Sequence, residues 1–226
     1  MTKALIFDSS TLISLSMNGL LEYLGKLKEI FDGKFIITQE VKREVIDKPL
    51  TIKRFELEAL RVRDLIYEKI LEMPDSLGIN HSEISNKTKE IMDIANNTFV
   101  EKNRNIHLIS DGEASCMALS KILTQKKIQN VICVDERTIR MLSEKPENLR
   151  RLMEKKLHTR INSKTGNYNF LKGFRFIRST ELIYIAYKKK LINIKNGVLL
   201  DALLYALKFK GCSISDTEIE EIKKLK

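Results

Sequence analysis

The chain has few of the residues that build disulfide frameworks or zinc centres. Its 226 residues include three cysteines and three histidines. The cysteines, Cys116, Cys133 and Cys212, are odd in number, lie far apart and stand among apolar residues. This arrangement predicts reduced core side chains in a cytoplasmic protein. The histidines show none of the spacings typical of metal ligands, so a zinc site is not expected.

Long apolar runs are also lacking. No run approaches the roughly 18 residues that cross a bilayer, and the first residues show neither the basic region nor the cleavage site of a signal peptide. Repeats, low-complexity tracts and Gly/Pro-rich linkers are absent too. With 43% hydrophobic and 31% charged residues, the composition predicts a folded domain with a proper core and no membrane partner.

Positive charge is concentrated in one part of the chain. Of a formal net charge of +10, residues 148–195 supply 13 Lys or Arg against two acids, so the remainder is close to neutral. Such a segment predicts contact with RNA or DNA, and its Tyr168, Phe170, Phe174 and Phe176 could stack on bases. A solvated face with these aromatic side chains in the core is the alternative. The candidate nucleic-acid-binding residues are Arg150, Arg151, Lys155, Lys156, Arg160, Lys164, Lys172, Arg175 and Arg178.

The first two thirds of the chain predict an α/β fold. Short runs rich in β-branched residues predict strands at Ala4–Phe7, Phe35–Thr38, Ile106–Ile109 and Val131–Val134. Apolar residues at helical spacing fill the intervals between these runs. Strands that alternate with helices, each apolar throughout, are typical of a parallel sheet covered on both faces.

The pattern changes near residue 147. A basic segment leads to a strand predicted at Phe174–Ile177, and helices are predicted at Thr180–Lys190 and Gly197–Gly211. We therefore expect one domain at residues 1–147 and a basic, mostly helical extension at 148–226 that packs on it.

Each predicted strand ends beside a carboxylate. Because the carboxyl ends of parallel strands share one edge of a sheet, where ligands bind in open α/β folds, these acids are expected to converge. A cation relieves the repulsion in such a cluster, and oxygen ligands alone suit Mg²⁺ or Mn²⁺. The acids are Asp8, Glu40, Asp111, Glu113 and Asp135.

Helix capping is the competing explanation for the same acids. Asp8 and Asp135 could each cap a helix, and Ser110 with Glu113 matches the S-x-x-E capping box. Glu40 could complement a helix dipole. Capping does not require every strand to end in this way, so the joint pattern favours a site.

Four stretches together resemble the PIN-domain family of metal-dependent nucleases. They are IFDSSTLISL, ITQEVKREV, SDGEASCMALSK and NVICVDERTIR, and the resemblance covers roughly residues 3–145. The tail KKKLINIKNGVLLDALLYALKFKGCSISDTEIEEI is similar to the C-terminal segment of a prokaryotic PIN-related family of predicted nucleic-acid-binding proteins.

The resemblance implies a three-layer α/β/α sandwich that cleaves single-stranded or structured RNA with Mg²⁺ or Mn²⁺. It places Asp8, Glu40, Glu113 and Asp135 at the acidic positions, with Asp111 able to assist Glu113. It also implies a homodimer as one expected assembly. The stretch from Glu40 to Asp111 is longer than in the compact toxin-type members.

Three other functions are considered beside an endoribonuclease. The first is a nucleic-acid-binding protein on the same fold that does not cleave. The second is a toxin-type ribonuclease inhibited by a small partner protein. The third is a haloacid-dehalogenase-type phosphatase, which needs a second aspartate two residues after the first. Ser10 stands at that position, which argues against the phosphatase.

Overall fold

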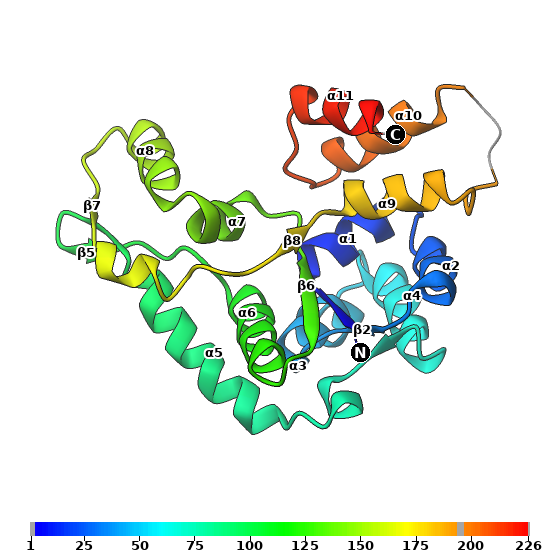
Figure 1. Ribbon diagram of the computed structural model, residues 1–226, viewed down its shortest axis with the longest axis horizontal. Coiled ribbons are helices and arrows are strands. Elements are labelled where there is room, and N and C mark those ends of the chain that lie inside the picture. The colour runs from blue at the N-terminus through cyan, green and yellow to red at the C-terminus, as the bar shows by residue number, and fades with distance from the viewer. Residues whose placement is uncertain (1–2, 194–196, 226) are drawn as a thin grey trace.

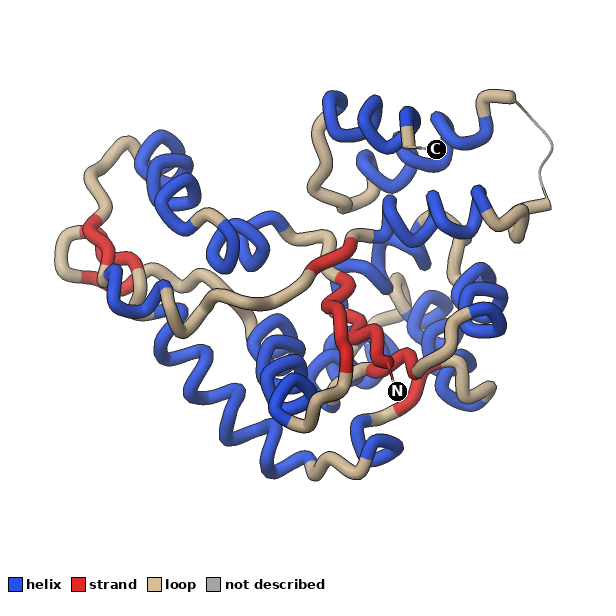
Figure 2. Tube along the Cα trace, in the orientation of Figure 1, coloured by secondary structure: helices blue, strands red, loops and turns tan. Residues whose placement is uncertain are grey.

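The computed structural model describes residues 3–193 and 197–225, and its centre is a parallel sheet of five strands. All four strand pairs are parallel, so the carboxyl ends of the five strands lie at one edge. The α/β class predicted from the sequence is thereby confirmed (Figure 2). Across the sheet the strands are β3 (Leu71–Glu72), β2 (Lys34–Ile36), β1 (Lys3–Phe7), β6 (Gln129–Cys133) and β8 (Phe176–Ile177).

Helices lie on both sides of this sheet. Figure 1 shows α5 and α6 on one side, and α1, α2 and α4 on the other. Helix α6 packs on β1 and β6, and α5 packs on α6. The α-helices are α1 (Ser9–Met17), α2 (Glu22–Ile30), α3 (Gln39–Lys42), α4 (Glu56–Tyr67), α5 (His81–Asn96), α6 (Asp111–Gln125), α7 (Arg137–Glu144), α8 (Pro146–Leu157), α9 (Ser179–Lys188), α10 (Leu199–Phe209) and α11 (Asp216–Lys224).

One predicted strand is wrong. Residues Ile106–Ile109 form no strand. The backbone N–H groups of Leu108 and Ile109 donate instead to the side-chain oxygen of Asn96, at 2.7 and 3.0 Å. The Asn96 side chain, at the end of α5, thus occupies the backbone N–H groups that pairing with a neighbouring strand would need. The other predicted strands are confirmed, with ends that differ by one or two residues.

A second, three-stranded sheet lies beyond the end of α5. It contains β4 (Phe99–Glu101), β5 (Arg104–Asn105) and β7 (Asn162–Ser163), and both of its strand pairs are antiparallel. Lys102 and Asn103 form the turn between β4 and β5, with φ of 43° and 65°. The sheet therefore joins this hairpin to the basic segment more than 50 residues later in the chain.

The expected extension contributes to the main sheet. Strand β8 lies within residues 148–226 yet pairs with β6, and α9 packs on α2. Helix α9 also packs on α10, and α10 on α11. The expected boundary at residue 147 stays a prediction, but the fifth strand of the sheet comes from beyond it.

The aromatic residues of the basic segment support the core alternative. Tyr168 is buried, meets Phe99 edge-on at 6.5 Å and donates its hydroxyl to Glu147. Phe170 packs against the core, and the Lys121 Nζ lies 3.2 Å from its ring centroid. These rings are therefore not placed to stack on bases.

The described part of the chain contains no helix with the length and apolar character needed to span a membrane. Cys116, Cys133 and Cys212 are free and buried, as predicted. Burial raises the pKa of all three thiols, that of Cys212 to about 12. These groups are uncharged core residues near neutral pH.

Candidate active site

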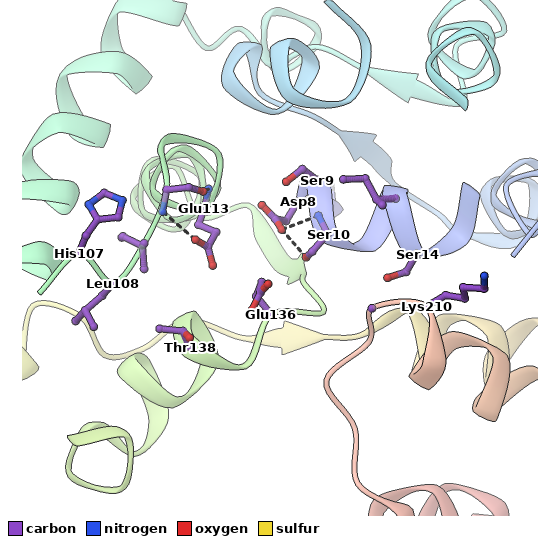
Figure 3. Close-up of a pocket in the computed structure, with 14 residues that line it drawn as sticks. Asp8, Ser9, Ser10, Ser14, His107, Leu108, Glu113, Glu136, Thr138 and Lys210 are labelled. Atoms are coloured by element: carbon purple, nitrogen blue, oxygen red, sulfur yellow. Dashed lines mark hydrogen bonds between the residues drawn. The ribbon is translucent and has the colours of Figure 1, made fainter. Parts of the chain in front are cut away.

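An open cleft of about 550 Å³ lies at the carboxyl edge of the main sheet. Its walls come from the first turns of α1 and α6, the segment before α6, the start of α7 and the turn after α10. Figure 3 shows Asp8, Glu113 and Glu136 reaching into this space from three different elements. Lys210 lies farther along the cleft, beside Ser14 (Figure 3).

Asp8 is a buried carboxylate with one unused oxygen. It is the N-cap of α1, where its Oδ2 accepts from the Ser10 amide at 3.0 Å and from the Ser10 hydroxyl at 2.5 Å. Its Oδ1 is buried without a hydrogen-bond partner among the described residues. Burial raises the pKa of Asp8 from 3.8 to about 6. The cap explanation is therefore correct for Asp8, yet it uses only one of the two oxygens.

Glu113 is the second buried acid of the cleft. It closes the capping box of α6, where its Oε2 accepts from the Ser110 amide at 2.9 Å. Burial and then the charge of Asp8 raise the pKa of Glu113 from 4.5 to about 7. The two acids predicted from distant parts of the sequence thus lie close enough to affect each other.

Glu44 joins these acids although the sequence analysis did not select it. Its Oε1 accepts from the Gly112 amide at 3.2 Å, and its charge contributes to the raised pKa of Asp8. A Cβ atom at Gly112 would lie 2.5 Å from the Glu44 Oε2. Glycine at this position therefore allows the Glu44 carboxylate to approach the first turn of α6.

Three of the five predicted site acids do not line the cleft, and Asp111 and Glu40 are the first two. Asp111 is exposed and pairs with Arg43 at 3.3 Å. Glu40, on α3, is half-buried and does not line the cleft, although its Oε2 is buried without a partner among the described residues. Glu44, four residues after Glu40, reaches the first turn of α6 but does not line the cleft either.

Asp135 is fully buried, and its carboxylate faces α9 instead of the cleft. Its two oxygens accept from the Ser179 amide and hydroxyl, both at 2.7 Å. Its backbone amide donates to the Ser10 hydroxyl at 3.0 Å. The next residue, Glu136, lines the cleft, and its charge raises the pKa of Glu113. Only the backbone of Asp135 thus contacts Ser10, and Glu136 supplies the carboxylate that lines the cleft.

The donor set of the cleft fits a hard divalent cation in its chemistry. The candidate ligands are carboxylates, and one buried oxygen of Asp8 has no partner among the described residues. Burial first, and then the charge of a neighbouring acid, raise the pKa of both Asp8 and Glu113. As they stand, however, no three of the described His, Cys, Asp and Glu side chains group closely enough to hold a metal ion.

The predicted basic residues fall into two groups. Arg178 is buried, with its guanidinium between Glu181, at 2.9 Å from Nε, and Glu218, at 2.7 Å from Nη1. Its assignment to nucleic-acid binding is therefore wrong. Arg150 is half-buried and pairs with Glu147 and Glu154. The remaining seven residues are exposed: Arg151, Lys155, Lys156, Arg160, Lys164, Lys172 and Arg175.

No protein-family model matches the chain, and neither a curated protein nor a solved structure matches it.

The raised pKa values of Asp8 and Glu113 predict that the metal-free protein loses stability as the pH rises. Between the ordinary values, 3.8 and 4.5, and the folded values, about 6 and about 7, the folded chain holds protons that the unfolded chain has released. The free energy of unfolding should thus fall from about pH 4 to about pH 7, by roughly 2 to 3 kcal/mol per group.

Urea unfolding in EDTA across this pH range measures the effect. The double variant Asp8→Asn/Glu113→Gln is the control, because other groups titrate equally in both proteins. Its stability should fall less with rising pH than that of the unchanged chain. Equal slopes would show that the two acids are not strained by burial.

Proposed function

We propose that the protein is an endoribonuclease that depends on Mg²⁺ or Mn²⁺, of the PIN-domain type that its sequence resembles. One observation carries the proposal: the buried carboxylates of Asp8 and Glu113 line the same open cleft at the carboxyl edge of a parallel sheet. Two buried carboxylates without a cation lower the stability of the fold. Acids with such raised pKa values are concentrated at functional sites.

The chain's own groups are suited to hold the ion and orient the substrate. Asp8, Glu113 and Glu136, which line the cleft, are the residues that would hold it. The Ser10 hydroxyl fixes Asp8, and the Ser110 amide fixes Glu113. Lys210 offers a positive charge to a phosphate in the same cleft. When bound, a divalent ion lowers the pKa of water and offsets charge on the phosphoryl oxygens.

Exposed basic residues support a nucleic-acid substrate. Arg151, Lys155 and Lys156 lie on α8, while Arg160 and Lys164 flank β7. Two exposed residues from the paired β4–β5 hairpin, Lys102 and Arg104, add to this basic surface. We call these seven residues, from α8, the ends of β7 and the hairpin, the basic surface. Positive charge of this density favours a polyanion, whether RNA or DNA.

Cleavage of a pool of labelled single-stranded and structured RNAs, with Mn²⁺, with Mg²⁺ and with EDTA, tests the proposal. Cleavage with either metal and none in EDTA is the expected result. Binding without cleavage in any of the three would contradict it and favour the non-catalytic nucleic-acid-binding protein, which the basic surface supports equally. A DNA pool run in parallel distinguishes the two substrates.

The basic surface itself is testable by removing charge. The double variant Lys155→Ala/Lys156→Ala should weaken RNA binding about equally for all sequences and lower the salt slope of log K by about 1 to 2. The reason is the loss of two phosphate contacts. Fluorescence anisotropy at several salt concentrations measures both quantities.

The matched control is Lys53→Ala/Lys126→Ala. Both lysines are exposed, and Lys126 follows the end of α6, at the opposite edge of the sheet from the cleft. This control removes the same amount of charge from outside the basic surface. The salt slope of its RNA binding should therefore equal that of the unchanged chain. An equal decrease in both variants would show that net charge, and not the basic surface, determines binding.

The assembly and the location of the protein stay predictions within this proposal. A homodimer, a small inhibiting partner and a cytoplasmic location follow from the resemblance and from the reduced cysteines. Size-exclusion chromatography of the purified chain with light scattering tests the first.

A further inference from the structure

The last residue of α10 is an unusually exposed aromatic side chain. Phe209 is 75% exposed. Large apolar side chains are normally buried, because each gains about 1.5–3 kcal/mol on leaving water. Neither the core nor the proposed metal-binding acids use this ring.

The ring is held from one side. Phe209 stacks on Tyr205, with ring centroids 6.0 Å apart and planes 29° apart. The Lys208 Nζ lies 5.5 Å from the Tyr205 centroid and 6.0 Å from that of Phe209, and it pairs with Asp216 at 2.5 Å. Tyr205 and Lys208 thus fix the orientation of a ring that remains largely open to solvent.

Phe209 immediately precedes two residues that line the cleft. Lys210 and Gly211, the next two residues, line the cleft together with Asp8. Gly211 has φ of +127°, and a Cβ atom there would lie 3.1 Å from the Ser14 Oγ. The turn is therefore pressed closely against α1, which fixes the end of α10 at the mouth of the cleft.

We propose that Phe209 stacks on an unpaired base of a single-stranded nucleic acid whose backbone enters the cleft past Lys210. This inference rests on the proposed function, because that function requires the nucleic-acid backbone to enter the cleft. It adds that the substrate is single-stranded. A flat ring next to a lysine matches a base next to a phosphate. In a duplex the bases are already stacked and paired, so this contact is closed to double-stranded substrates.

Charge complementarity favours this occupant over a protein. Lys210, the residue after the ring, lines the cleft, while Lys208 before it is already paired with Asp216. The apolar side chains of Leu203, Leu204 and Leu207 on α10 are buried. Protein interfaces are depleted of lysine, whereas nucleic-acid-binding grooves combine cations with aromatic rings.

Anisotropy with labelled single-stranded and duplex oligonucleotides in EDTA tests the inference. Phe209→Ala should weaken single-strand binding about 10-fold and duplex binding by less than about twofold, and Phe209→Trp should restore it. The matched control is Tyr67→Ala. Tyr67 is 70% exposed with Arg63 over its ring, but α4 leads into β3 and so ends at the opposite edge of the sheet. This control should change neither affinity.

Several outcomes overturn the inference. They are an unchanged single-strand affinity of Phe209→Ala, an equal loss for the duplex, and no restoration by Phe209→Trp. Loss of self-association in Phe209→Ala with unchanged oligonucleotide binding would assign the ring to a protein contact. Binding in EDTA separates this inference from the nuclease proposal. If binding depends on Phe209 but no cleavage occurs in Mg²⁺ or Mn²⁺, only the nuclease proposal is contradicted. If cleavage occurs and Phe209→Ala does not affect it, only the stacking proposal is contradicted.

Discussion

Replacing Asp8 by asparagine should lower the rate of metal-dependent RNA cleavage by about 100- to 1000-fold while RNA affinity stays within about twofold. The amide has the shape of the carboxylate and its oxygen can still accept from the Ser10 amide. It lacks the negative charge that a divalent ion requires. Single-turnover cleavage with saturating protein, in Mn²⁺ and in Mg²⁺, separates the loss of rate from any loss of binding.

The fold should survive this change. A neutral side chain at position 8 removes the cost of burying an ionised carboxylate, so Asp8→Asn should be at least as stable as the unchanged chain above about pH 7. Retained stability makes a lost rate interpretable as chemistry.

Asp111→Asn is the matched control for this experiment. Asp111 lies two residues before Glu113, at the start of the same helix, but its carboxylate is exposed and pairs with Arg43. The same chemical change there should alter the cleavage rate by less than about threefold, because an exposed ion pair contributes little. Equal losses in the two variants would contradict the site assignment.

Replacing Arg178 by methionine should lower the free energy of unfolding by about 1.5–3 kcal/mol, because it removes the buried cation that hydrogen-bonds two half-buried acids. Arg178 joins Glu181 of α9 to Glu218 of α11 and also donates to the Ser213 carbonyl. Without it, Glu181 keeps its charge in a half-buried position that lacks a cation. Urea unfolding at pH 7 measures the loss.

Arg175→Met is the control for this second experiment. Arg175 stands three residues earlier in the same basic segment but is exposed. Its replacement should change the free energy of unfolding by less than about 0.5 kcal/mol. Equal stability of the two variants would contradict the prediction. It would show that the ion pairs of Arg178 contribute no more to stability than an exposed arginine does.

The sequence predicts those parts of the fold whose signal is local. The strands at Ala4–Phe7 and Val131–Val134 are continuous apolar runs, which are typical of strands buried in a parallel sheet. The strand predicted at Ile106–Ile109 fails because Asn96, ten residues earlier, takes two of its backbone donors. A side chain that bonds a distant backbone leaves no periodic signal.

Short elements are missed for a related reason. The apolar pattern of α4 continues to Met73, yet the helix ends at Tyr67, and Lys69 has φ of 57°. The left-handed conformation of Lys69 changes the direction of the chain, and Leu71 and Glu72 then form β3. A strand of two residues is specified by its neighbour β2 and not by its own composition.

The candidate site is predicted in part. Asp8 follows from the rule that acids at strand ends converge. Glu113 reaches the same edge from the first turn of α6, although the strand predicted before it does not form. Glu44 is missed because it lies in a π-helical turn, Arg43–Asp47, whose wider winding changes which side chains share a face. Arg178 is misassigned because net charge ignores pairing, although Glu181 three residues later is a visible signal of a local partner.

The hydrogen bonds between Asp8, Ser10, Asp135 and Ser179 also have a consequence for biosynthesis. During translation, β1, β6 and most of the acids of the cleft leave the ribosome well before Ser179, whose amide and hydroxyl are the donors to Asp135. Until then the buried carboxylate of Asp135 has no partner, which disfavours the closed arrangement. The cleft itself is completed later still, because Lys210 and Gly211 also line it, so a nascent chain attached to its own messenger RNA lacks the finished cleft.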